Sequence, residues 1–252
     1  MEKAGGNTTL IMQIIWRNIM ISLSKRIFVA AIMFGKIASG FAGEAILFDD
    51  PGLIGYRDGE SISGLYDAEN EKFSCYFLFS QDGGARPRPN IGGYTDTALL
   101  TFIPGDRSLE YNDRNRFFDI PGNLYRENDE WVLHTSSGQA GCENSTGGFT
   151  FKLGSKEASR YSVEETIPAI GIRLIKRKSF LYNYQNGKFL ARRGFLTKGN
   201  AVIVLEKRDG FSLVRFSDPR LNKDSYGKIT INWIHTVDLV DPFPSIIRAL
   251  KQ

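Results

Sequence analysis

The sequence predicts an all-β protein that consists of a β-sandwich or barrel domain followed by a second, smaller barrel. Short strand-like segments recur along the chain and are separated by turn-forming pairs such as Asp58-Gly59 and Pro104-Gly105. No long amphipathic helix separates these segments, which disfavours a parallel sheet. The composition, with 42% hydrophobic and 24% charged residues, excludes a disordered or disulfide-dense chain.

Residues 1–43 have the pattern of a secretory signal peptide or an N-terminal extension. A basic pair, an apolar run (27–34) and a stretch of small residues follow one another, with a cleavage position after Ala42. Lys36 interrupts the apolar run, which argues against a retained membrane anchor. We therefore expect a periplasmic or secreted protein that touches a membrane only through an uncleaved leader.

Charge is divided between two halves of the remaining chain. Residues 44–160 carry 11 basic and 19 acidic side chains, a net charge of −8, whereas residues 161–252 carry 16 basic and 8 acidic side chains, a net charge of +8. The overall charge of +4 is that of the leader alone. The asymmetry therefore lies between two halves that can attract each other or meet differently charged partners. Because export is expected, nucleic acid is not expected as a partner.

The first domain is expected over residues 44–160. The apolar alternation and the turns between segments predict strands at 46–48, 61–66, 73–80, 98–103, 131–134 and 149–153. Residues 86–93 contain two prolines and predict an exposed loop, and residues 106–118 have room for one helical turn.

The two cysteines are expected to form a disulfide. Cys75 lies in an alternating segment that places Phe73, Phe77 and Phe79 on the same core face, and Cys142 follows a turn-rich stretch. Two cysteines of an exported protein pair by default in an oxidising compartment. The alternative interpretation takes Cys142 as a nucleophile with His134 as its base, but no other part of the sequence resembles a cysteine peptidase.

A short motif in the first domain suggests one possible activity. Ser63, Gly64 and Tyr66 resemble, with one residue of offset, the Ser-Gly-x-x-Tyr loop of periplasmic lysozyme inhibitors. Such inhibitors insert a polar loop into the lysozyme cleft and need no catalytic group. The resemblance implies an inhibitor or immunity protein that acts on a cell-wall-degrading enzyme, whereas a plain strand and turn would account for the same four residues.

The second domain carries a longer resemblance. An aromatic stretch (181–188), an apolar strand that follows a Gly-Asn turn (199–205) and a late Asn-Trp-Ile sequence (232–234) occur in the order typical of bacterial SH3-like domains. The resemblance covers residues 165–241. Asn200 and Asn232 replace the aspartate and the glycine that are usual in that family.

The apolar pattern supports the same barrel independently of the resemblance. Residues 201–205 are apolar on both faces, as expected of a central strand, and Asp209-Gly210 predicts a hairpin turn. Pro242 and Pro244 end the barrel, which leaves residues 242–252 as a tail or a short helix.

We expect the second domain to bind its ligand through an aromatic groove with basic residues beside it. SH3-like barrels bind extended peptides in such grooves, and the resemblance implies cell-wall peptide or an envelope protein as the partner. The candidate ligand-binding residues are Tyr182, Tyr184, Phe195, Phe211, Trp233, Arg192 and Arg193.

No catalytic residue, metal site or cofactor is predicted. The chain has only two histidines and two cysteines, and its acidic clusters lack the spacing of a calcium loop. The predicted function is therefore non-catalytic binding, with a cell-wall hydrolase as a possible protein partner. Because SH3-like domains often accompany wall hydrolases, a hydrolase whose catalytic domain is the first one is the alternative from another class.

Overall fold

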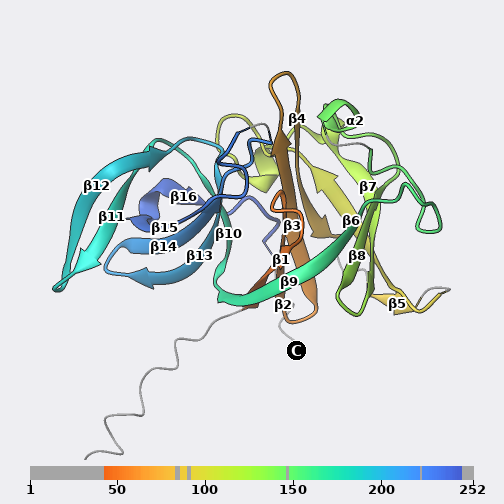
Figure 1. Cartoon of the computed structure of the whole chain (residues 1–252), viewed down its shortest axis with the longest axis horizontal. Coiled ribbons are helices and arrows are strands. Elements are labelled where there is room, and N and C mark those ends of the chain that lie inside the picture. Colours follow the sequence, from red (N-terminus) through yellow and green to blue (C-terminus); the bar gives the residue numbers. More distant parts are fainter. Residues whose placement is uncertain (1–42, 83–85, 90–91, 146–147, 222, 246–252) are drawn as a thin grey trace, which may run out of the picture. The chain divides into compact units, whose positions relative to one another are not determined.

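The computed structural model describes residues 43–82, 86–89, 92–145, 148–221 and 223–245, and strands dominate it (Figure 1). The all-β prediction is confirmed. The predicted signal peptide or extension (1–43) lies outside the described residues except for Gly43, which begins the first strand. The predicted tail or short helix (242–252) is described only to Ser245.

The first sheet closes into an eight-stranded antiparallel barrel. Its order is β4-β3-β2-β1-β9-β8-β7-β6, and β4 pairs with β6 to complete the ring. The two-residue β5 (Arg88–Pro89) pairs with the first residues of β6. The barrel strands are β1 (Gly43–Phe48), β2 (Leu53–Asp58), β3 (Ser61–Glu69), β4 (Ser74–Gln81), β6 (Thr95–Phe102), β7 (Ile120–Glu127), β8 (Glu130–Thr135) and β9 (Arg160–Ala169).

The second sheet, sheet B, is curled but open. Its order is β12-β11-β15-β14-β13-β10-β16, and its two end strands are not paired with each other. Its strands are β10 (Gly171–Ile175), β11 (Ser179–Gln185), β12 (Lys188–Leu196), β13 (Ala201–Arg208), β14 (Phe211–Ser217), β15 (Ile229–His235) and β16 (Leu239–Val240). The short helices are η1 (Tyr111–Asp113), η2 (Arg116–Phe118), α2 (Cys142–Ser145) and η3 (Thr236–Asp238).

Aromatic side chains fill the barrel interior. Alternation along β4 turns Cys75, Phe77 and Phe79 inward, and all three are fully buried. Phe73, which the alternation also placed on this face, precedes β4 and is 43% exposed. The neighbouring strand has Gly64 opposite Phe79, where a Cβ atom would lie only 2.3 Å from the Phe79 ring, so a glycine is needed there.

The predicted disulfide between Cys75 and Cys142 is present and connects β4 to α2, with Cα atoms 4.2 Å apart. Both cysteines are buried in the barrel core. The bridge joins residues 67 positions apart in the sequence, so it fastens the loop after β8 over the barrel.

Strand β13 is buried on both faces, as its apolar run predicts. Ala201 and Ile203 pack with the outer face of the barrel, where they contact a cluster that includes Leu65 and Phe102. Val202 and Val204 point into the interior of sheet B. A continuous hydrophobic cluster therefore joins the barrel to sheet B.

Several elements differ from the sequence prediction. Strands β2, β7 and β9 were not predicted, and the predicted strand at 149–153 is a loop. Phe149 from this loop enters the barrel core, where its ring lies 5.0 Å from that of Tyr66. The first sheet ends at Ala169 and sheet B begins at Gly171, several residues beyond the expected end of the first domain at 160.

Candidate functional site

The candidate site is a group of six rings on one face of sheet B, here called the aromatic cluster. Four strands contribute to it through cross-strand pairs, in which Tyr182 lies opposite Trp233 and Tyr184 opposite Phe189. Paired residues share a face of the sheet, which explains why these rings meet. The members of the cluster are Tyr182, Tyr184, Phe189, Phe211, Trp233 and His235.

Ring contacts connect the members of the cluster into one surface. Phe189 and Phe211 are stacked, with their ring centroids 3.9 Å apart, and Phe189 also meets Trp233 edge-on at 5.3 Å. Trp233 is 7% exposed, while the other five side chains are half-buried. The rings are therefore packed against one another, and five of the six remain partly accessible to solvent.

One polar contact lies within the aromatic cluster, and one cation lies beside it. The Nε2 atom of His235 lies 3.1 Å from the hydroxyl of Tyr182. The guanidinium of Arg208 lies 4.7 Å from the ring centroid of Tyr184, within the range of a cation–π contact. Arg208 forms an ion pair with Glu206 at 2.6 Å, and hydrogen bonds with Tyr184 and Glu206 raise the pKa of Arg208.

Four of the five predicted aromatic ligand-binding residues, Tyr182, Tyr184, Phe211 and Trp233, belong to the aromatic cluster. Phe195 instead lies opposite Phe180 on the paired strand, with the ammonium of Lys178 4.0 Å from its ring centroid.

The two predicted arginines lie on β12. Arg192 donates to the side-chain oxygen of Asn232 at 3.0 Å, and Arg193 is exposed.

The structure places Ser63, Gly64 and Tyr66 in the middle of strand β3 rather than in an exposed loop. The Tyr66 side chain is only 2% exposed, and its hydroxyl donates to a carboxylate oxygen of Asp50 at 3.0 Å. Its ring stacks on Phe77 inside the barrel. These residues are core and strand positions and offer no surface loop to a partner.

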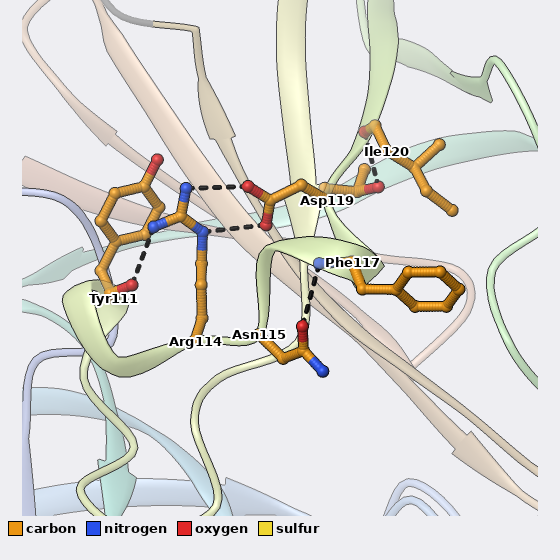
Figure 2. A network of polar contacts seen from close by, with 7 residues as sticks. Tyr111, Arg114, Asn115, Phe117, Asp119 and Ile120 are labelled. Atoms are coloured by element: carbon orange, nitrogen blue, oxygen red, sulfur yellow. Dashed lines mark hydrogen bonds and ion pairs between the residues drawn. The ribbon is translucent and has the colours of Figure 1, made fainter.

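The β6–β7 connection forms a second polar network (Figure 2). The Arg114 guanidinium donates to both carboxylate oxygens of Asp119, at 2.9 and 2.8 Å, and lies 3.6 Å from the Tyr111 ring centroid. Asn115 caps η2 by accepting from the backbone N–H of Phe117 at 3.0 Å. These contacts hold the Phe117 side chain in solvent, where it is 84% exposed.

A cavity of about 500 Å³ lies beside this connection. Its lining mixes carboxylates, one arginine, an amide and apolar groups, namely Ile103, Pro104, Gly105, Asp106, Arg107, Asp113, Asn115 and Phe118. In the described residues, no three histidine, cysteine, aspartate or glutamate side chains come together in a group that could hold a metal ion.

Sequence reasoning missed Phe189, His235 and Arg208 as members or neighbours of the candidate site. The signal for Phe189 was present, because the Asn186-Gly187 turn fixes the register that places Phe189 opposite Tyr184. The signal for Arg208 was also present, because the Asp209-Gly210 turn places Arg208 opposite Phe211. His235 joins through the pairing of β14 with β15, which no short-range pattern indicates.

No protein-family model, curated protein or solved structure gives a significant match to this chain. Among the described residues, no helix combines the length and the apolar character needed to cross a membrane. The arrangement of the candidate site is therefore the basis for the functional proposal.

Proposed function

We propose that this protein is an exported, non-catalytic binding protein whose aromatic cluster binds an extended peptide of the cell envelope, such as a peptidoglycan stem peptide or a segment of an envelope protein. The observation that carries the proposal is the aromatic cluster itself. It presents Tyr182, Tyr184, Phe189 and Phe211 half-exposed on one face of sheet B.

The chemistry of the aromatic cluster suits an extended peptide. Tyrosine and tryptophan combine a large apolar face with a polar atom, and they dominate the energetics of many interfaces. Because Trp233 and Phe211 are already packed, little side-chain freedom is lost on binding. The adjacent Arg208 adds a cation that can meet a peptide carboxylate.

Export is supported by two independent features. The leader has the order of a signal peptide, and the mature body contains the buried Cys75–Cys142 disulfide. Structural disulfides persist mainly in oxidising compartments, and the periplasm and the cell exterior are both of this kind. These features support the proposal that the protein acts in the periplasm or outside the cell.

Co-sedimentation of the full chain with purified peptidoglycan, followed by titration with a soluble stem peptide, tests the proposal. Tyr184→Ala is expected to weaken binding by at least about tenfold, because it removes a central ring of the aromatic cluster. Phe195→Ala is the matched control, since Phe195 is an exposed aromatic residue of the same sheet that contacts Phe180 and Lys178.

The control variant is expected to bind within about twofold of the unmodified chain, because scattered exposed aromatic residues contribute little. Equal losses for Tyr184→Ala and Phe195→Ala would contradict the assignment of the site. Failure of the full chain to bind either peptidoglycan or the stem peptide would contradict the proposed ligand.

A further inference from the structure

The outer edge of β12 is the one long strand edge left open in the described part of the chain. The barrel closes on itself through β4 and β6, and the two-residue β5 and β16 are the other sheet ends. Strand β12 has nine residues and lies at the end of sheet B (Figure 1). Such an edge presents a row of N–H and C=O groups that can pair with an additional strand.

The hairpin register identifies which backbone groups of β12 are available. The Asn186-Gly187 turn has positive φ at both residues, as a two-residue hairpin turn requires. Residues that flank such a turn exchange both hydrogen bonds, and pairs then alternate along the ladder. Lys188 and Leu190 therefore bond to β11, whereas the N–H and C=O groups of Phe189 and Ala191 point away from it.

The same register determines which side chains of sheet B would lie next to those of an added strand. Phe189 belongs to the aromatic cluster, and Ala191 lies opposite Tyr182 on the same face. A strand that pairs with β12 would place every second side chain next to this face. Its remaining side chains would lie on the opposite face, which carries the exposed Lys188 and the 47% exposed Leu190.

The charge of the hairpin favours one kind of added strand. Strand β12 carries Lys188, Arg192 and Arg193, and neither β12 nor β11 contains an acidic residue. Like charges disfavour pairing with the β12 of a second copy, while carboxylates opposite these cations would be stabilised. A bulge near Arg192 further limits regular pairing of two identical edges.

We propose that β12 binds an extended peptide with alternating apolar and acidic side chains as an added strand of sheet B. This inference rests on the proposed function and specifies how the peptide is held: backbone hydrogen bonds to Phe189 and Ala191, apolar contacts with the aromatic cluster, and carboxylates near Lys188 and the arginines.

The experiment measures binding of the full chain to a synthetic seven-residue peptide of alternating Glu and Val by fluorescence anisotropy. Two further peptides have the same sequence and carry N-methyl groups on alternate residues, one on the Glu residues and the other on the Val residues. Each modification removes one set of N–H donors without a change in charge. One N-methylated peptide is expected to bind at least about tenfold more weakly, and the other nearly as well as the unmodified peptide.

A protein variant tests the same contact from the other side. Ala191→Pro removes an N–H that β11 does not use, and proline is tolerated at a strand edge, so the hairpin is expected to persist by circular dichroism. It should weaken binding of the Glu-Val peptide by about fivefold or more.

Each other outcome overturns the inference in a distinguishable way. If both N-methylated peptides bind as well as the unmodified peptide, and Ala191→Pro binds it as well as the unmodified protein, the peptide is held through its side chains alone. This result contradicts the added strand but leaves the proposed function intact. If the Glu-Val peptide does not bind while Tyr184 is still needed for retention on peptidoglycan, the added strand is likewise contradicted and the proposed function remains. Concentration-dependent dimerisation that Ala191→Pro abolishes would assign the edge to a second copy.

Discussion

Aromatic side chains group together both inside the barrel and in the aromatic cluster of sheet B, but the two groups differ in burial. In the closed barrel, Tyr66, Phe77, Trp131 and Phe149 are at most 3% exposed, because eight strands surround them. In the open sheet B, the aromatic cluster is packed on one side only, and the edge of β12 remains unpaired. Closure of the sheet thus decides whether aromatic side chains contribute to stability alone or are also available for recognition.

Alanine substitutions in the two clusters give the largest expected contrast. Phe77→Ala should lower the free energy of unfolding by about 3–5 kcal/mol, because it leaves a cavity in the fully buried barrel core. Tyr184→Ala, at a half-buried position, should cost about 1 kcal/mol. Urea denaturation followed by tryptophan fluorescence measures both values, and equal losses would contradict the distinction between the two clusters.

Removal of the disulfide tests how much this bond contributes to the free energy of unfolding. The double variant Cys75→Ala, Cys142→Ala opens a loop of 67 residues, and a loss of about 2–5 kcal/mol is expected. The loss should appear in urea unfolding of the oxidised protein and disappear when both proteins are compared under reducing conditions. A stability difference that persists after reduction would mean that side-chain packing, and not the bridge, is responsible.

A further effect, which depends on pH, is expected at Asp67, where a barrel strand meets the segment after β14. Burial, together with Glu69 and Asp218, raises the pKa of Asp67 to about 7. The folded state then retains this proton to a higher pH than the unfolded state, so stability falls as the pH rises from about 4 to 7.

Asp67→Asn should therefore be more stable than the unmodified protein at pH 8, by about 2 kcal/mol, and nearly equal to it at pH 4. Glu60→Gln, at an exposed turn of the same barrel, is the matched control. Urea midpoints measured across this pH range check the expectation, and an identical pH dependence for all three proteins would refute it.

The sequence was most informative where local chemistry determines structure. The Asp209-Gly210 turn and the two-faced burial of β13 follow directly from residue type and alternation. A turn also forms at Gly59-Glu60, one residue beyond the expected Asp58-Gly59 pair. Strand β9 was missed because its segment contains charged residues such as Glu164 and Glu165, and β7 because its Pro121-Gly122 pair resembles a turn. Closure of the barrel depends on long-range pairing, which no local pattern records.

The candidate site was predicted in part for the same reason. Alternation within β11 places Tyr182 and Tyr184 together, and the hairpin of β13 and β14 brings Phe211 close. Phe195 lies outside the aromatic cluster because it pairs with Phe180, near the opposite end of β11 from Tyr184. The bulge between Phe180 and Tyr182 changes the register of β11 and β12, and alternation in the sequence does not show such a change.

The pairing of β1 with β9 determines when the barrel can form. Gly43 lies opposite Ala169, so the ring closes only when β9, the last barrel strand in the sequence, can pair with β1. Folding that depends on such distant contacts is slow, typically milliseconds to seconds for β-rich domains, since the entropy of a long loop must be lost first. A chain in which β9 has not yet paired would expose two unpaired edges and the aromatic interior, the features most prone to aggregation.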